Sequence, residues 1–258
     1  MILIIVLCTL LTTGYVLLML AYRKGWKAQR TFRLPADYSP KTFISIVIPA
    51  RNEHHNIGGC IDAILAQNYP TDLFEVIVVD DHSEDDTVAI VKEYKEENVR
   101  CISLAEHLEK GKKINSYKKA ALAAGITNSN GTLIVTTDAD CIAPNRWLLH
   151  IAAKYEQEHP VMIIAPVIYT TNESVLQLFQ QVDFMSMQGI TVAAHNLGLG
   201  NMSNGANLAF TKEAYDEVNG YQGIDKLASG DDFLLLMKIS KRYPGKVAYL
   251  KSTYATVR

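Results

Sequence analysis

Residues 133–140 read LIVTTDAD and join a run of apolar and β-branched residues to two aspartates. Such a run predicts a buried strand, so Asp138 and Asp140 come directly after its carboxyl end. Two carboxylates one residue apart can bind one hard divalent cation, Mg²⁺ or Mn²⁺, with water and substrate phosphates completing its coordination. The alternative is a solvated turn, in which aspartate is common. We favour metal binding because parallel sheets bind ligands at the carboxyl ends of their strands.

The flanking sequence alternates between short apolar runs and segments with helical spacing. This alternation predicts an α/β fold with a mostly parallel central sheet and helices on both faces. Residues 198–207 are rich in glycine and asparagine and predict a loop. We expect strands at 43–48, 74–79, 99–104, 133–137 and 247–258, and helices at 56–66, 87–94, 116–124, 174–193 and 230–239.

Polar and acidic side chains also follow two other predicted strands. Residues 49–53 read PARNE, and residues 80–83 read DDHS. A carboxylate can accept hydrogen bonds from the N–H of a pyrimidine or from ribose hydroxyls, so we assign Asp81 to a nucleotide base. Ser83 or Asp85 could cap the helix that begins near residue 87, and the two interpretations are compatible.

A second pair of acids, Asp231 and Asp232, follows Gly230 at the start of a predicted helix. Acids are favoured there by the helix dipole, so capping is one interpretation. The other is a general base that removes the proton of an acceptor hydroxyl. The sequence leaves both open, because it does not give the distance from either carboxylate to an acceptor.

Four lysines, Lys112, Lys113, Lys118 and Lys119, flank the third predicted helix. One of them can contact phosphate oxygens, and we include Lys119 among the donor-binding candidates, although a solvated face explains most of the group. The sequence contains neither a Gly-x-x-x-x-Gly-Lys-Ser/Thr loop nor a dinucleotide-binding glycine pattern, which argues against P-loop and dinucleotide-cofactor proteins.

The overall composition fits one sizeable domain with a short additional segment. The 258 residues carry a net charge of −2, so no basic surface predicts nucleic-acid binding. The cysteines at 8, 60, 101 and 141 lie too far apart for paired metal-ligand spacing. A reducing, cytosolic setting is the simpler fit.

The first 22 residues predict a transmembrane anchor. Residues 2–22 contain no charged side chain and as a helix would span about 30 Å, roughly one bilayer core. Four basic residues lie between 23 and 30, which predicts a cytoplasmic location for this end and for the catalytic part. A cleaved signal peptide is the alternative, but it carries its positive charge before the apolar run. We expect an anchor over 1–22, a linker over 23–42 and a catalytic domain over 43–258.

Four ordered motifs together resemble the inverting glycosyltransferases of family 2, which have the GT-A fold. The motifs are IVIPARNE (46–53), VVDDHS (78–83), TDAD (137–140) and GDD (230–232). Their order and spacing match over about residues 43–250. The segment 204–210, NGANLAF, also resembles the one that precedes the catalytic acid in the family, near the acceptor.

The resemblance implies a role for each matching residue. Asp232 would be the catalytic base. The family pattern is commonly Glu-Asp, and this chain has Asp231 in the first place, which leaves open which acid acts. Pro49, Arg51 and Glu53 would line the nucleotide pocket, and Asp81, with Asp80, would contact the nucleotide base. Asp138 would lie near the ribose or diphosphate, and Asp140, with Asp138, would bind the metal. Asn204 and Gly205 would lie on the acceptor side.

The implied reaction is inverting transfer of a hexosyl or N-acetylhexosaminyl group from a nucleotide-diphosphate donor, with UDP favoured. The acceptor would be a hydroxyl of a lipid-linked molecule or a glycan, as in the synthesis of cell-envelope polysaccharide, and the cofactor Mg²⁺ or Mn²⁺. Polymer-making members carry a Gln-x-x-Arg-Trp motif and further membrane helices after this point, so we expect the chain to be a fragment. Two alternatives remain: a nucleotidyltransferase, and a membrane-tethered module that binds a sugar nucleotide without turnover.

Overall fold

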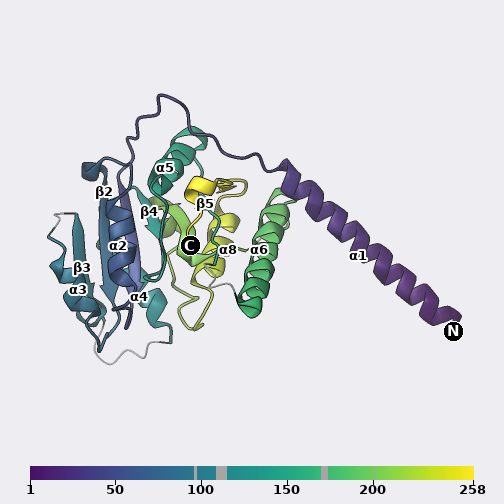
Figure 1. The fold of residues 1–258 in the computed structure, drawn as a ribbon, viewed down its shortest axis with the longest axis horizontal. Coiled ribbons are helices and arrows are strands. Elements are labelled where there is room, and N and C mark those ends of the chain that lie inside the picture. Colours follow the sequence, from purple (N-terminus) through teal and green to yellow (C-terminus); the bar gives the residue numbers. More distant parts are fainter. Residues whose placement is uncertain (96–97, 109–114, 170–173, 201) are drawn as a thin grey trace. The chain divides into compact units, whose positions relative to one another are not determined.

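The computed structural model describes residues 1–95, 98–108, 115–169, 174–200 and 202–258, so the predicted lysines Lys112 and Lys113 lie outside it. The chain forms two compact units (Figure 1). One consists of Met1–Thr31 and Tyr169–Met202, and the other of Phe32–Ile168 and Ser203–Arg258.

The first unit contains two helices, α1 (Ile2–Ala28) and α6 (Val175–Asn196). α1 is long and apolar enough to cross a membrane, and its residues up to Leu20 are exposed. It continues through Ala28, so residues 23–28 of the predicted linker are helical. The buried residue of α1 is Gly25, where α6 packs closely against it.

The second unit is built around a sheet that has seven strands in the described part of the chain, in the order β3-β2-β1-β4-β6-β5-β7. Neighbouring strands are parallel except for β6, which runs antiparallel to β4 and β5. This mostly parallel sheet confirms the predicted fold class. The strands are β1 (Ile44–Ala50), β2 (Phe74–Asp80), β3 (Val99–Ser103), β4 (Leu133–Thr136), β5 (Met162–Ile164), β6 (Leu208–Thr211) and β7 (Val247–Tyr249).

Helices and short 3₁₀ turns connect these strands. The predicted helices at 56–66, 87–94, 116–124 and 230–239 each overlap an observed helix. The helices are α2 (Ile57–Leu65), α3 (Thr87–Glu93), α4 (Tyr117–Thr127), α5 (Trp147–Glu158), α7 (Lys212–Glu217) and α8 (Asp231–Arg242). The 3₁₀ turns are η1 (Thr71–Leu73), η2 (Leu104–His107), η3 (Gly205–Asn207) and η4 (Thr253–Ala255).

Side chains on both faces of the central strands are buried. Successive side chains of a strand point to opposite faces, so Ile46 and Val47 face opposite ways, and both have no exposed surface. α4 packs against the face of Val47, because a Cβ added to Gly125 would meet the side chains of Val47 and Val79. Burial on both faces explains why these strands are continuous apolar runs rather than alternating patterns.

The carboxyl-terminal half differs from the sequence-based prediction. The short strands β5 and β6 were not predicted, because three or four residues are too few to show a period. Residues 247–258 were predicted as one strand, which is wrong. Only Val247–Tyr249 forms β7, η4 follows, and Val257 makes an isolated bridge with Val167.

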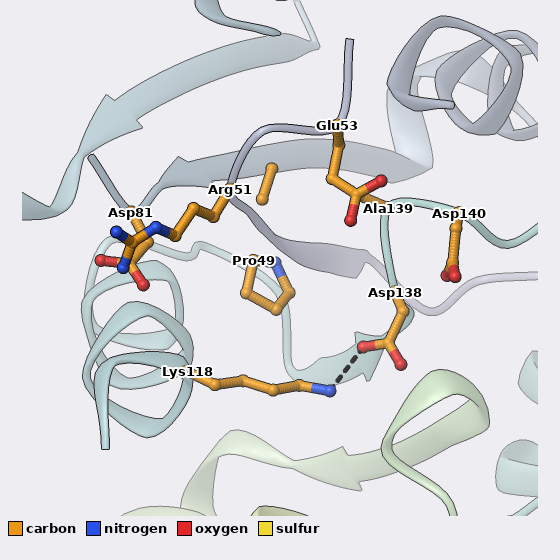
Figure 2. A pocket seen from close by; sticks show the side chains of 9 residues that line it. Pro49, Arg51, Glu53, Asp81, Lys118, Asp138, Ala139 and Asp140 are labelled. Atoms are coloured by element: carbon orange, nitrogen blue, oxygen red, sulfur yellow. Dashed lines mark hydrogen bonds and ion pairs between the residues drawn. The ribbon is translucent and has the colours of Figure 1, made fainter. Parts of the chain in front are cut away.

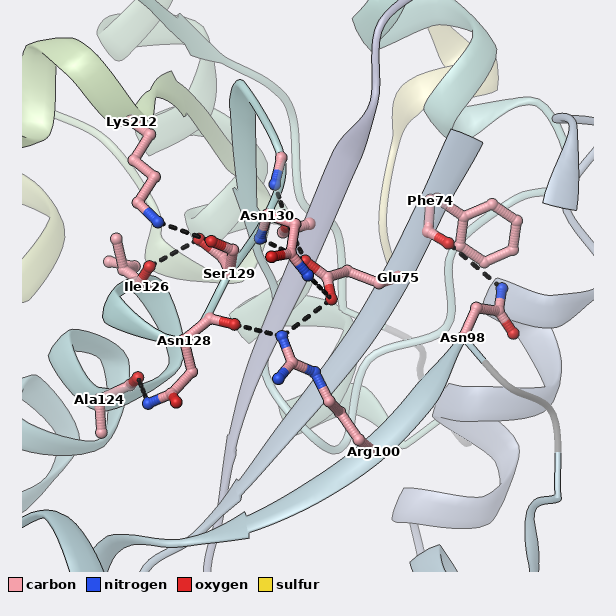
Figure 3. Close-up of polar contacts among 12 residues, drawn as sticks. Phe74, Glu75, Asn98, Arg100, Ala124, Ile126, Asn128, Ser129, Asn130 and Lys212 are labelled. Carbon is pink, nitrogen blue, oxygen red and sulfur yellow. Dashed lines mark hydrogen bonds and ion pairs between the residues drawn. The ribbon is translucent and has the colours of Figure 1, made fainter. Parts of the chain in front are cut away.

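Glu75 ties the amino-terminal ends of β1, β2 and β4 together (Figure 3). Its carboxylate accepts hydrogen bonds from Ser45 Oγ (2.6 Å), the backbone N–H of Asn130 (2.6 Å) and Arg100 Nη2 (2.9 Å). Because Glu75 is buried and fully engaged at this edge, it is a structural acid. It stabilises the amino-terminal edge of the sheet, whereas the candidate site lies at the carboxyl edge.

Candidate active site

Hydrogen bonds join the loops that follow β1 and β2. Asn52 adopts a left-handed backbone conformation (φ 56°), which asparagine tolerates better than most residues. Its backbone N–H donates to Ser83 Oγ (3.0 Å), and its Oδ1 accepts from the N–H of Glu84 (2.8 Å). The N–H of Glu53 donates to Thr87 Oγ1 (2.8 Å). These contacts hold the two loops side by side at the carboxyl edge of the sheet.

A pocket of about 260 Å³ opens at this edge. It collects side chains from the ends of β1, β2 and β4 and from α4, as Figure 2 shows. Its lining residues are Pro49, Ala50, Arg51, Glu53, Asp81, Lys118, Asp138, Ala139 and Asp140. The structure therefore brings together the predicted residues Pro49, Arg51, Glu53, Asp81, Asp138 and Asp140.

Asp80, predicted beside the nucleotide base, points elsewhere. It is buried, and its Oδ1 accepts a hydrogen bond from the N–H of Ser83 (3.1 Å). This contact shapes the loop that presents Asp81, so Asp80 supports the pocket through its neighbour.

Lys119, which was predicted to contact phosphate, binds backbone carbonyl oxygens in the structure. Only 2% of it is exposed, and its ammonium donates to the carbonyl oxygens of Ile224 (2.9 Å), Leu227 (2.7 Å) and Ser229 (2.8 Å). It holds the segment that leads into α8. Successive residues of a helix point about 100° apart, so one of two adjacent lysines can face the pocket while the other does not.

Lys118 brings an ammonium into the pocket beside a predicted metal ligand (Figure 2). Its Nζ lies 2.6 Å from Asp138 Oδ1 and 4.0 Å from Asp231 Oδ2. Burial by itself lowers the pKa of Lys118, but the carboxylates of Asp138, Asp231 and Asp232 outweigh it, and the pKa is raised. Lys118 therefore carries a positive charge at neutral pH, between the end of β4 and the start of α8.

Asp138 and Asp140 both line the pocket and offer the hard oxygen ligands that Mg²⁺ and Mn²⁺ prefer. Among the residues that the structure describes, no three or more His, Cys, Asp or Glu side chains are arranged to hold a metal ion. Burial and the charges of Asp140 and Asp138 raise the pKa of the neighbouring Cys141 thiol to about 12, and a thiol is in any case a soft ligand that Mg²⁺ and Mn²⁺ do not favour. The two aspartates thus fit a cation that takes further ligands from water and donor phosphates.

Asp231 lies in the first turn of α8, close to the predicted acceptor segment. Gly230 caps this helix with a φ of 74°, a conformation that favours glycine. A Cβ added to Gly205 would lie 2.9 Å from Asp231 Oδ2, so a larger residue at that position would require the Asp231 side chain to shift. Asp231 therefore lies between Lys118 of the pocket and the turn at Gly205.

Asp232, the predicted base, is half-buried at the same helix start. Its Oδ1 accepts a hydrogen bond from the N–H of Phe233 (2.6 Å). Burial raises the pKa of Asp232; the N–H of Phe233 opposes this shift, and the negative charge of Asp231 adds to it. The raised pKa makes this carboxylate a stronger base than an exposed aspartate.

The predicted acceptor residues Asn204 and Gly205 are held in place by local hydrogen bonds. Asn204 Oδ1 accepts from the N–H of Ala206 (3.0 Å) and so caps η3. The carbonyl of Gly205 accepts from Thr136 Oγ1 (2.7 Å), at the end of β4. The turn is thereby fixed to the strand that leads to the two metal-binding candidates.

Asn207 is important to this turn, and no individual role was predicted for it. It has no exposed surface, and its Oδ1 accepts from Trp147 Nε1 (2.9 Å). Its Nδ2 donates to the carbonyls of Pro166 and Ala255, each at 2.7 Å. A buried role was hard to foresee because asparagine in a Gly/Asn-rich stretch is typical of an exposed loop.

Comparison with known proteins identifies the family. Residues 45–199, more than half of the chain, match the sequence profile described as Glycosyl transferase family 2. The chain belongs to this family. The match covers the pocket residues of this family 2 glycosyl transferase from Pro49 to Asp140, whereas Asp231 and Asp232 lie beyond the matched residues.

Known relatives match shorter stretches. The glycosyltransferase AglE of Haloferax volcanii is 36% identical over 106 residues, which cover 41% of this chain and 33% of that protein. The dolichyl-phosphate beta-glucosyltransferase of Drosophila melanogaster is 31% identical over 122 residues, which cover 43% and 35%. The matched stretches span about a third of these relatives' own length.

A solved structure supports the fold across nearly the whole chain. The mannosyltransferase PcManGT of Pyrobaculum calidifontis, in complex with GDP-Man and Mn²⁺, matches with a TM-score of 0.68 and 21% sequence identity. The match covers 93% of this chain and 63% of that one. This likeness confirms the predicted GT-A-like fold of the family 2 protein.

Proposed function

We propose that the protein transfers a hexosyl or N-acetylhexosaminyl group, with inversion, from a nucleotide-diphosphate donor to an acceptor at a membrane. The observation that carries the proposal is the pocket at the carboxyl edge of the sheet, where Asp81, Asp138 and Asp140 lie with Lys118. Lys118 in turn lies 4.0 Å from Asp231 of the second acid pair. Sugar transfer needs a base contact, a diphosphate site and a proton acceptor, and these residues can provide them.

The donor would occupy this pocket. Asp81 would accept a hydrogen bond from a ring N–H of the nucleotide base, which uracil and guanine both offer. UDP is the donor nucleotide that the family resemblance favours. Asp138 and Asp140 would hold Mg²⁺ or Mn²⁺, and the Mn²⁺ in the PcManGT complex supports that choice. A bound cation would neutralise the charge that develops on the leaving diphosphate. Lys118, which contacts Asp138 at 2.6 Å, would donate to a diphosphate oxygen as well.

The transfer itself displaces the nucleoside diphosphate. An acceptor oxygen attacks the anomeric carbon from the side opposite the leaving group, a new C–O bond forms, and the bond to the diphosphate oxygen breaks. With a hydroxyl acceptor, the proton passes to the carboxylate of Asp232, whose raised pKa suits this role. Lys118 balances the charge that leaves with the diphosphate, and Asp231 helps to position Lys118.

A lipid phosphate is a second class of acceptor, and the name of one relative supports it. The Drosophila melanogaster relative has dolichyl phosphate in its name. A phosphate monoester has its second pKa near about 6, so at about pH 7.5 most of it has no proton left to remove. Attack by a phosphate oxygen would therefore need no general base, whereas attack by a hydroxyl would.

The membrane is part of the same proposal. α1 is long and apolar enough to cross a bilayer, and its charged residues begin at Arg23. We propose that α1 anchors the protein with the catalytic unit in the cytoplasm, since basic residues follow the apolar run. Anchorage would keep the pocket near lipid-linked acceptors.

The Asp232→Asn variant separates the two acceptor classes. With a hydroxyl acceptor, we expect kcat to fall by about 10²- to 10⁴-fold, the usual contribution of a general base. With a polyprenyl phosphate acceptor, kcat should stay within about tenfold of the wild type, because the nucleophile is already ionised. Asp72→Asn, at an exposed aspartate in η1, is the matched control and should not change either rate.

The released product tests the proposal against its alternatives. Sugar transfer releases a nucleoside diphosphate, while a nucleotidyltransferase would release pyrophosphate. Pyrophosphate release, or donor binding with no turnover on either acceptor class, would contradict the proposed reaction.

A further inference from the structure

α6 carries a stripe of exposed apolar side chains, which we call the apolar stripe. It consists of Val175, Leu178, Phe179, Val182 and Met185, at the i, i+3, i+4, i+7 spacing that puts residues on one helix face. Each is at least half exposed, from 53% for Met185 to 87% for Val175. Soluble surfaces rarely leave a row of large apolar side chains uncovered, so this face calls for a partner.

Outside the apolar stripe, α6 mixes polar residues with apolar ones, including the exposed Leu176 and Met187, and it is almost uncharged. Gln177, Gln180 and Gln188 lie on the side away from the apolar stripe, by the 100° rotation per residue of a helix. Residues 175–196 contain no lysine or arginine, and Asp183 is the single acid. The helix is therefore amphipathic, and its apolar stripe rather than positive charge must supply the binding energy for any partner.

The contact between α6 and α1 indicates what that partner is. A Cβ added to Gly25 of α1 would collide with the backbone of Ala193, and Asn196 Nδ2 donates to Gln29 Oε1 (2.9 Å). Gly25 lies three residues beyond Tyr22, where the uncharged run ends, or about 5 Å farther along the helix axis. α6 therefore joins α1 at the level where the apolar run gives way to basic residues, which is the depth of lipid headgroups.

We propose that α6 is an interfacial helix that lies on the bilayer surface, with the apolar stripe inserted at the boundary between headgroups and acyl chains. The proposal rests on the membrane anchorage of α1, which is part of the proposed function. An interfacial helix buries its apolar face about 5–10 Å into that boundary. Because α6 lacks cationic residues, a zwitterionic lipid surface is sufficient.

Two tryptophan variants of the full chain test this arrangement. Val182→Trp puts a probe in the apolar stripe, and Gln180→Trp puts one at an exposed position on roughly the opposite side, two residues or about 200° away. The two probes would differ in depth by about 10 Å, the width of a helix with its side chains. Each variant is reconstituted in phosphatidylcholine vesicles with and without brominated acyl chains, and wild-type emission from Trp26 and Trp147 is subtracted.

We expect the brominated lipid to quench the Val182→Trp probe several-fold more strongly than the Gln180→Trp probe, with no need for anionic lipid. Equal, weak quenching of both probes would overturn the proposal, and quenching of Trp26 in the same sample would show that α1 is still anchored. A blue-shifted Val182→Trp emission without lipid quenching would also overturn it, because a protein surface would then cover the apolar stripe. Failure of the chain to associate with vesicles would reject the anchorage of α1 and, with it, the role of α6.

Discussion

Replacing Asn207 by alanine should destabilise the catalytic unit far more than its size suggests. The substitution removes three hydrogen bonds at a site with no solvent exposure. It leaves the Trp147 Nε1–H and the Ala255 carbonyl without the partner seen here, whereas the Pro166 carbonyl still accepts from the N–H of Val257 (3.2 Å). A buried polar group left unpaired costs about 1–3 kcal/mol, so two of them cost roughly 2–6 kcal/mol. We expect a loss of about 4 kcal/mol in the free energy of unfolding.

Urea unfolding of the full chain in detergent measures this loss, with Trp147 fluorescence and circular dichroism as two probes of the transition. Asn68→Ala, at an exposed position, is the matched control and should stay within about 0.5 kcal/mol of the wild type. A loss below about 1 kcal/mol for Asn207→Ala, similar to the control, would refute the reasoning. It would mean that water or local rearrangement satisfies these groups, and that Asn207 does not hold the acceptor-side turn.

Two further predictions concern the second acid pair and its support. Because the pKa of Asp232 is raised and the base must be ionised, kcat with a hydroxyl acceptor should fall as the pH drops through that raised value. In the pH–rate profile of the Asp231→Asn variant, this fall in kcat should occur at lower pH, because the charge of Asp231 helps to raise the pKa of Asp232. A fall that stays at the same pH or moves to higher pH contradicts the assignment of Asp232 as the base. Lys119→Met leaves three carbonyls without their ammonium donor and should lower the unfolding free energy by about 3 kcal/mol and reduce kcat. Donor affinity, measured by calorimetry, should not change in this variant. A large loss of donor affinity would mean that Lys119 contributes to donor binding, as the sequence predicted.

The sequence predicted the first half of the fold well and the second half poorly. β1, β2 and β4 are buried on both faces and appear as continuous apolar runs bounded by polar turns, and the half-buried edge strand β3 is also a short run rich in apolar residues. The positions of these four strands were therefore predicted to within a few residues. β6 has four residues and follows a Gly/Asn-rich stretch, so the local signal indicated a loop. Its place between β4 and β5 depends on antiparallel pairing with strands distant in the sequence, which no local pattern records.

The site shows the same division. Residues that follow a buried strand directly, such as Asp81, Asp138 and Asp140, could be grouped from the sequence because parallel strands end at one edge. The choice between Lys118 and Lys119 depended on the rotation of α4, which two adjacent lysines do not reveal. Asn207 was missed because its three partners come from separate segments of the chain.

The most direct test of the central claim is isothermal calorimetry of the full chain with UDP, with and without Mn²⁺. We expect binding that requires Mn²⁺ and that weakens by at least about tenfold, or about 1.4 kcal/mol, in Asp140→Ala. Asp72→Ala, an exposed aspartate in η1, is the control and should bind like the wild type. GDP in place of UDP tests the choice of base independently of the metal. Equal affinity with and without Mn²⁺, and in Asp140→Ala, would contradict a metal-dependent donor site at the end of β4.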